Sequence, residues 1–306
     1  MNVKISIGIP TFNQGLYLEK AITSVLDQTV KPYEFIISNN HSTDGITDEI
    51  LKKYSDKVKI ISPPEHLNMI ENFCFLEQNM TGDYITFSCS DDFYEKNFIE
   101  EFLNNLNDEA VLHRFGVNFI DEAGRTIRSN RISSLNKIQS FPKNFYEQLS
   151  GPKGSLGGSV LSKEAVRKVG FFDTKLKLTA DWGLFLKLAE IGKFAYIDEI
   201  VSNIRVDYRP SLPIERFPID VADFYYIYGV IQKGIIENNQ LNSKRYNNAL
   251  KLRLFSLETF MKMNDISKFP SYDQFKELVP IPHIKSKFQY LLRCNYQRFY
   301  EALIKR

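Results

Sequence analysis

The chain has 306 residues, of which 43% are hydrophobic and 25% charged, so its composition excludes a disordered or low-complexity chain. Its 39 basic and 37 acidic residues give a net charge of +2, which provides no chain-wide field for binding nucleic acid. The charge is uneven, because residues 1–215 hold 24 basic and 29 acidic side chains and residues 216–306 hold 15 and 8. This asymmetry predicts two regions with different partners.

Short apolar runs and amphipathic helices alternate through the first hundred residues. We expect strands at 3–9, 34–38, 58–61 and 83–88, and helices at 18–26, 45–54, 70–77 and 98–106. This alternation predicts an α/β fold with a mostly parallel sheet covered by helices. Such sheets bind ligands at the carboxyl ends of their strands, so the polar residues that follow the strands are the candidates for a site.

The pattern loosens after Ala110. A hairpin at 111–120 and 126–129, a helix at 181–190 and a strand at 193–198 are expected, followed by aromatic-rich helices from residue 220. The glycine-rich segment 151–158 predicts a mobile or tightly turned loop. We therefore predict a boundary near residue 215, between an α/β domain at 1–215 and a helical region at 216–306.

The cysteines and the N-terminus bear on the cellular compartment. Cys74, Cys89 and Cys294 lie far apart, without a disulfide framework or metal-ligand spacing, which favours a reducing compartment. The first residues do not resemble a signal peptide, and no run of about 18 apolar residues predicts a membrane span. A cytoplasmic location is expected.

Polar segments follow three of the predicted strands, at Pro10–Gly15, Asn39–Gly45 and Ser90–Phe93. Amides and hydroxyls suit a nucleotide base and ribose, and the adjacent carboxylates of Asp91 and Asp92 suit a hard divalent cation. Structural alternatives remain open, because such loops also form ordinary turns and Asp92 could cap the following helix.

Four segments in order resemble the family 2 glycosyltransferases, whose catalytic domain is a GT-A-type α/β sheet. They are PTFNQGLYLEKAITSVLDQT from Pro10, EFIISNNHSTDGI from Glu34, GDYITFSCSDDF from Gly82 and GFFDTKLKLTADWGLFLKLAEIG from Gly170. The resemblance covers about residues 3–207. It implies inverting transfer of a sugar from a nucleotide-diphosphate sugar, with UDP expected, to a hydroxyl of a glycan or lipid-linked acceptor, assisted by Mn²⁺ or Mg²⁺.

The same resemblance implies roles for individual residues. Asp181 matches the general base, although it could also cap the helix that begins there. Asp91, Asp92 and Asp207 are the implied metal ligands. The implied nucleotide-binding residues are Pro10, Thr11, Asn13, Asn39, Asp44, Asn68 and Asp91.

Three positions depart from the family pattern. Asn39 stands where an aspartate usually contacts uracil, and its amide oxygen can still accept a hydrogen bond from a base N–H. Cys89 stands where the family often has the first aspartate of the metal motif, a residue that generally faces ribose or water, so the implied metal ligands remain in place. Asp207 follows Arg205 where a histidine commonly sits near the metal.

Two other functions stay open, a sugar nucleotidyltransferase and a non-catalytic scaffold subunit. A nucleotidyltransferase needs a glycine-rich basic loop after the first strand, whereas Pro10–Gly15 has one glycine and no Lys or Arg.

At 283–306 basic and aromatic residues are interleaved, which is typical of a helix on an anionic membrane surface. The alternative is a helix that packs on the catalytic domain or on a second subunit of a homo-oligomer.

Overall fold

The structure is a computed structural model that describes residues 3–132, 137–206, 219–220, 222–224 and 226–250. The chain divides into two compact units, Met1–Ala249 and Leu250–Arg306, and all described residues except Leu250 belong to the first. The predicted metal ligand Asp207 and the basic aromatic segment 283–306 lie outside the described residues. The predicted boundary near residue 215 also falls in an undescribed stretch and stays a prediction.

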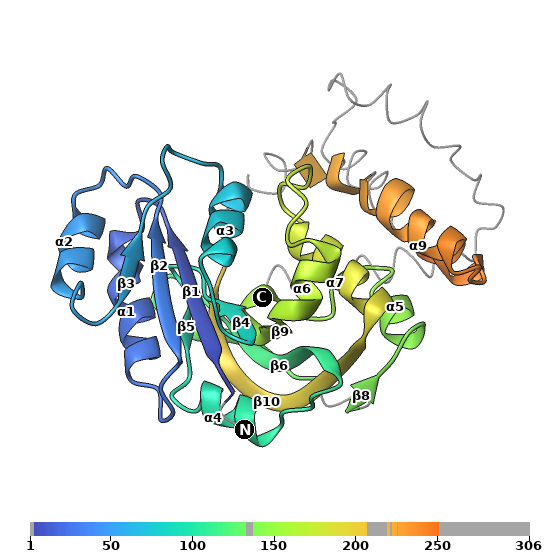
Figure 1. The fold of residues 1–306 in the computed structure, drawn as a ribbon, viewed down its shortest axis with the longest axis horizontal. Helices are drawn as coiled ribbons and strands as arrows, with labels where there is room; N and C mark the ends of the chain where they lie inside the picture. Colours follow the sequence, from blue (N-terminus) through green and yellow to red (C-terminus); the bar gives the residue numbers. More distant parts are fainter. Residues whose placement is uncertain (1–2, 133–136, 207–218, 221, 225, 251–306) are drawn as a thin grey trace. The chain divides into compact units, whose positions relative to one another are not determined.

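The N-terminal part of the sheet is parallel, as the sequence predicts. Its strands lie in the order β3-β2-β1-β4 and all run the same way (Figure 1). The strands are β1 (Ile5–Thr11), β2 (Glu34–Asn39), β3 (Lys59–Ile61) and β4 (Tyr84–Phe87). The helices between them are α1 (Gly15–Leu26), α2 (Ile46–Lys53) and α3 (Met69–Gln78).

Beyond β4 the sheet is mixed, so the α/β class is confirmed but the mostly parallel arrangement is limited to the first four strands. β9 (Ser159–Ser162) lies antiparallel between β4 and β6 (Ala110–Ile120), and β6 runs parallel to β10 (Lys193–Arg205). The predicted hairpin is confirmed, since β6 pairs with β7 (Thr126–Asn130). Two short strands, β5 (Phe93–Tyr94) and β8 (Ile138–Gln139), pair antiparallel with β10.

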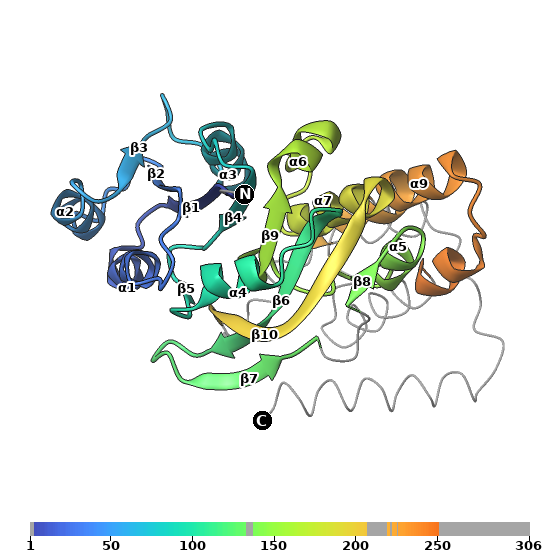
Figure 2. The same ribbon diagram turned by 60° about the horizontal axis from the view of Figure 1, so that its bottom comes forward.

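Helices cover both faces of this sheet. Figure 2 shows α1 and α4 (Phe98–Asn104) on one face, and α3, α6 (Lys163–Val169) and α7 (Ala180–Ile191) on the other. Ile5, Ile7 and Ile9 of β1 are buried in a core cluster with residues of α1 and α4. Gly8 faces α3, and a Cβ there would lie 2.9 Å from Leu76 Cδ2, so the sheet and α3 are in close contact.

Two further helices contact α7. They are α5 (Lys143–Glu147) and the π-helix η2 (Ile227–Gln232), which continues into α9 (Lys233–Asn238), whereas the 3₁₀ turn η1 (Leu156–Gly158) lies against β4, β6 and β10. Tyr228 of η2 packs edge-on against Trp182 of α7 and donates a hydrogen bond to the Leu149 carbonyl (2.6 Å). Trp182 is therefore a core residue. No helix in the described parts of the chain combines the length and the apolar character needed to cross a membrane.

Candidate active site

The three polar segments meet at one edge of the sheet. β1 is the parallel neighbour of both β2 and β4, so the carboxyl ends of all three strands lie together. Pro10 and Thr11 end β1, and the Thr11 carbonyl accepts a hydrogen bond from Asn40 N (2.9 Å) in the loop after β2. On the other side, Ser88 N donates to the Gly8 carbonyl (3.1 Å) at the start of the loop after β4.

Side chains bind the first loop to the second. Asn13 adopts a left-handed backbone with a φ of 53°, which asparagine tolerates better than most residues. Its Oδ1 accepts from Thr43 N (2.6 Å), and its own N–H donates to Ser42 Oγ (3.0 Å). Asp44 accepts from Gly15 N (3.2 Å) at the start of α1. The two predicted nucleotide-binding residues Asn13 and Asp44 thus hold these loops together.

Asn39 and Asn68 also have structural partners. Asn39 Oδ1 accepts from Ser42 N (3.1 Å), and Asn39 Nδ2 donates to Asp48 Oδ1 (3.0 Å). Asn68 is the N-cap of α3 and forms a capping box with Glu71. The amide of Asn39 is therefore engaged within its own loop, whereas Asn68 shapes the start of a helix beside the site.

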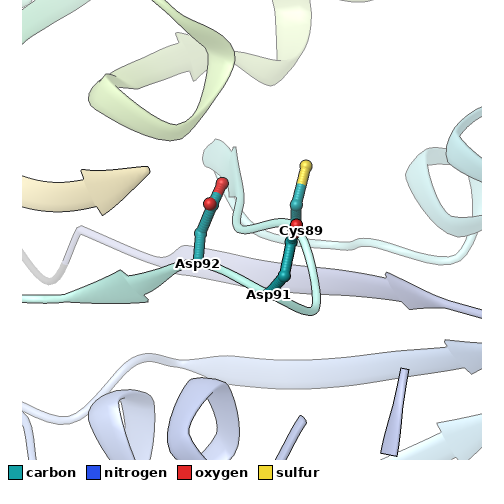
Figure 3. A group of neighbouring side chains, drawn as sticks. All are labelled: Cys89, Asp91 and Asp92. Carbon is teal, nitrogen blue, oxygen red and sulfur yellow. The ribbon is translucent and has the colours of Figure 1, made fainter. Parts of the chain in front are cut away.

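Cys89, Asp91 and Asp92 form a group with metal-ligand chemistry. Their side chains point to the same side of the loop after β4 (Figure 3), and their possible ligand atoms all lie within 4.8 Å of one another. Asp92 is buried and accepts from Arg205 N (2.8 Å) through Oδ1. It does not cap α4, whose N-cap is Asn97. Carboxylate oxygens are the ligands that Mg²⁺ and Mn²⁺ prefer, so the group fits such an ion.

The electrostatics of this group favour a cation. Burial raises the pKa of Asp91, and burial together with the charge of Asp91 raises the pKa of Asp92 well above the usual value for an aspartate. The Arg205 guanidinium donates from Nη1 to the carbonyls of Asp121 and Glu122 (2.5 and 2.6 Å). Because its hydrogen bonds go to backbone carbonyls, neither carboxylate receives one from this side chain.

Asp181 lies in the first turn of α7, on the side of the site formed by the second half of the sheet. Its Oδ1 accepts from Trp182 N (2.7 Å), while the N-cap is Thr179. Burial raises the pKa of Asp181 to about 6, against the opposing effect of the Arg114 cation. Asp181 lies near the metal-ligand group, since its charge, like those of Asp92 and Asp91, raises the pKa of the exposed Cys89 thiol.

The segment that leads into α7 is fixed by a residue that the sequence analysis did not single out. The buried carboxylate of Asp223 accepts hydrogen bonds from the backbone N–H groups of Lys177, Leu178 and Thr179, at 3.0, 2.8 and 2.9 Å. A carboxylate with several backbone donors is a strong local constraint. Asp223 therefore sets where α7 begins and, with it, the position of Asp181.

The glycine-rich segment 151–158 also borders the site. It is tightly turned, as predicted, because Gly151 and Gly154 have φ of 145° and 158° and η1 follows. A Cβ on Gly154 would lie 2.6 Å from Arg114 Cδ, and one on Gly157 would lie 3.8 Å from Asp92 Oδ2. Arg114 was missed by the sequence analysis, although a charged residue in the apolar run VLHRFGV was an available signal.

Comparison with known sequences identifies the family. The profile of Glycosyl transferase family 2 matches residues 6–170, more than half of the chain. The chain belongs to this family. A Rickettsia typhi protein described as an uncharacterised glycosyltransferase is 30% identical over 210 residues, which cover 66% of this chain and 64% of that protein.

Other relatives are longer. A Rickettsia conorii glycosyltransferase, also uncharacterised, is 29% identical over 207 residues, or 66% of this chain and 34% of that protein. The chondroitin synthase of Pasteurella multocida is 26% identical over 252 residues, or 80% of this chain and 24% of that enzyme. The chain thus spans about a third or less of the length of these two relatives.

Solved structures with the same fold include Staphylococcus aureus TarS. Its residues 1–349 bound to UDP superpose with a TM-score of 0.66 at 18% identity, covering 90% of this chain and 81% of that one. The complex of the same TarS segment with UDP-GlcNAc gives a TM-score of 0.56 at 14% identity, over 83% and 81% of the two chains. At such identities the likeness concerns the fold, and it confirms the GT-A-type architecture of this family 2 member.

Proposed function

We propose that this protein is an inverting glycosyltransferase that moves a sugar from a UDP-sugar to a hydroxyl of a glycan or lipid-linked acceptor. The observation that carries the proposal is the meeting of the Asp91–Asp92 pair with Asp181 at one site of a family 2 chain. UDP is supported by the TarS complexes. Sugar transfer is also supported by the S. aureus poly(ribitol-phosphate) β-N-acetylglucosaminyltransferase TarP, 33% identical over 126 residues, which cover 37% of this chain and 37% of that protein.

Asp181 is the proposed general base. It takes the proton of the acceptor hydroxyl as the acceptor oxygen bonds to the anomeric carbon, while the bond from that carbon to the diphosphate breaks and UDP leaves. Attack from the face opposite the leaving group inverts the configuration of the carbon. A pKa of about 6 leaves the carboxylate largely ionised at neutral pH, and a positioned base contributes about 10²–10⁴-fold to the rate.

Asp91 and Asp92 are the proposed ligands of Mn²⁺ or Mg²⁺, with Asp207 as a further ligand from outside the described residues. The cation would offset the negative charge of the diphosphate. Asn13, Asn39 and Asp44 are already hydrogen-bonded within the loops. We therefore expect the nucleotide to be held largely by the shape and backbone groups of these loops, and by Pro10, Thr11 and Asn68 at their edges.

The test combines binding and turnover. Melting temperatures are measured with UDP, GDP and CDP, with and without Mn²⁺, because a ligand of the folded state raises its stability. UDP with Mn²⁺ should give the largest shift, and UDP-GlcNAc should then release UDP, its sugar passing to water or to an added hydroxyl acceptor, in a reaction that Asp181→Asn slows by about 10²–10⁴-fold. Asp56→Asn, which alters an exposed aspartate, is the control. No shift with any nucleotide would instead favour the scaffold function.

The location of the enzyme is part of the same proposal. We place it in the cytoplasm, with segment 283–306 either at the inner face of the cell membrane or packed on protein. Flotation with anionic liposomes, with and without residues 283–306, distinguishes the two, because only a membrane-bound segment carries the protein to the top of the gradient. The oligomeric state of the protein that does not float tests the packing alternative.

A further inference from the structure

Arg114 of β6 is an anomaly in this fold. Its side chain is completely buried, yet Nε, Nη1 and Nη2 have no hydrogen-bond partner among the residues that the structure describes. A buried cation without such partners is strongly unfavourable, and native structures rarely keep one without a role. The contribution of Arg114 to the stability of the fold therefore does not explain its presence.

The position of the guanidinium points to Asp181. The Arg114 Cζ lies 4.2 Å from the centroid of the Phe185 ring in α7. Phe185 follows Asp181 by four residues in the same helix, and side chains at that spacing share one helix face. Gly154 closes the space from the other side, because a Cβ there would lie 2.6 Å from Arg114 Cδ. The cation is therefore held on the face of α7 that carries Asp181.

Other titratable groups surround this pair. Tyr196 of β10 is the strand partner of Arg114, and its buried hydroxyl also lacks a partner among the described residues. Burial and the charge of Glu147 in α5 raise the pKa of Tyr196. The charge of Asp181 raises the pKa of the Cys89 thiol in the loop after β4. Of these groups Arg114 is the one that favours the ionised form of Asp181, while burial favours the protonated form.

We propose that Arg114 is a positioning residue for the general base: its buried guanidinium, together with the hydrogen bond from Trp182 N, keeps the Asp181 carboxylate ionised. The inference rests on the proposed function, since a base must have lost its proton before it can take one from the acceptor. Burial of the guanidinium strengthens the interaction, because water screens it less there. The Phe185 ring adds a cation–π contact that fixes the guanidinium plane.

The first test does not require activity. Melting temperatures of the wild type, Arg114→Met, Asp181→Asn and the double variant form a double-mutant cycle. At about pH 8 the effects of the two substitutions should differ from additivity by several degrees, and at about pH 4 they should add, since Asp181 is then protonated. Arg128→Met is the matched control, because Arg128 also stacks on a phenylalanine, with Cζ 4.1 Å from the Phe119 ring, but is exposed.

The second test follows UDP release from UDP-GlcNAc against pH. Arg114→Met should move the acidic limb of the turnover number to higher pH by about one unit, which is about a tenfold loss on that limb and little loss at about pH 9. Arg114→Lys, which keeps the charge, should leave the limb close to that of the wild type. Affinity for UDP should not change in any of these variants.

The outcomes separate the two proposals. Additive effects of the two substitutions at about pH 8, or an unmoved acidic limb in folded Arg114→Met, would overturn the role of Arg114 and leave the transferase function intact. Non-additivity in a protein that releases no UDP would support the interaction of Arg114 with Asp181 and contradict the proposed function. If Arg114→Met does not fold, Arg114→Gln, which removes the charge but keeps a polar side chain, provides the cycle with Asp181→Asn, and a departure from additivity at about pH 8 supports the proposal whereas additivity overturns it.

Discussion

The two halves of the sheet treat their polar side chains differently. In the parallel half, β3-β2-β1-β4, buried polar groups are paired, as in Asn40, whose amide bonds both the N–H and the carbonyl of Leu67 (2.9 and 2.7 Å). Among the described residues of that half, Thr11 alone has a buried side-chain polar atom without a partner. In the mixed half the unpaired atoms recur, on Arg114, Tyr196 and Ser202 among others.

This contrast indicates a division of labour. Loops whose polar groups are satisfied keep their shape without a ligand, so the parallel half is suited to receive a nucleotide in a preformed site. Unpaired buried groups destabilise the fold and are kept where they serve the chemistry. The mixed half, with Asp181 and Arg114, is therefore where we expect stability and activity to conflict.

The largest expected effect separates binding from turnover. Asp181→Asn should lower the turnover number by about 10²–10⁴-fold with unchanged UDP affinity, because the general base is lost and the nucleotide loops are untouched. Asp91→Asn should weaken Mn²⁺-dependent UDP binding as well, because it removes a proposed ligand. Calorimetry with UDP and Mn²⁺ measures the UDP affinity, and UDP release measures the turnover number. Equal loss of UDP affinity in both variants would contradict the division between the halves.

The connection between the halves should be nearly as sensitive. Lys163 at the start of α6 forms a buried ion pair with Glu77 of α3 and also donates to the Glu77 carbonyl (2.6 Å). Lys163→Met leaves a buried carboxylate unpaired, so the free energy of unfolding should fall by about 3–5 kcal/mol in urea titrations. The control is Lys168→Met, which breaks an exposed pair with Glu164 on the same helix and should change nothing measurable.

Asp181 should destabilise the protein at neutral pH. Its pKa is about 6 in the folded state against about 3.9 for an aspartate in an unfolded chain, so the folded state binds the proton more tightly. Stability should therefore fall as pH rises from about 4 to 6 and stay reduced above that window. Asp181→Asn should be more stable than the wild type by about 1–3 kcal/mol at pH 7 and equal to it near pH 4. A constant difference across this range would show that Asp181 does not titrate in this way.

The smallest effect concerns Asn68, predicted from the sequence to bind the nucleotide and found at the N-cap of α3. Asn68→Ala should reduce stability by about 1 kcal/mol, because the cap to Glu71 N is lost. Asn68→Asp keeps a capping oxygen and should retain the stability. A drop in UDP affinity in both variants would restore a direct role in nucleotide binding, whereas a drop in neither would assign Asn68 to the helix alone.

The N-terminal half was predictable because its signals are local. β1, β2 and β4 are apolar runs that stop at turn-forming residues, and parallel neighbours place the residues after them at one edge. The place of Asp91 and Asp92 after β4 was therefore predictable from local signals, whereas Asp181 was singled out by the resemblance to the family. Their proposed roles still await the variants described above.

The mixed half was less predictable for two physical reasons. β5 and β8 have two residues each and β9 has four, too few to show a period, so these three antiparallel strands could not be recognised. Asp92 accepts a hydrogen bond from Arg205 N, and Asp223 accepts one from Thr179 N in the turn before α7, so both bonds join residues far apart in sequence. No local pattern encodes such a contact, because it depends on how the sheet closes.

Substitutions in the loop 151–158 should be selected against, although this loop supplies no side chain to the proposed reaction. At Gly158 a Cβ would come 2.5 Å from Val117 Cγ1, and at Gly154 it would meet Arg114. Nearly every amino-acid substitution at these two positions should therefore be depleted in a library selected for sugar transfer, as strongly as substitutions of the aspartates. By this depletion the two glycines would be classed with the active-site residues, although what they contribute is the absence of a side chain.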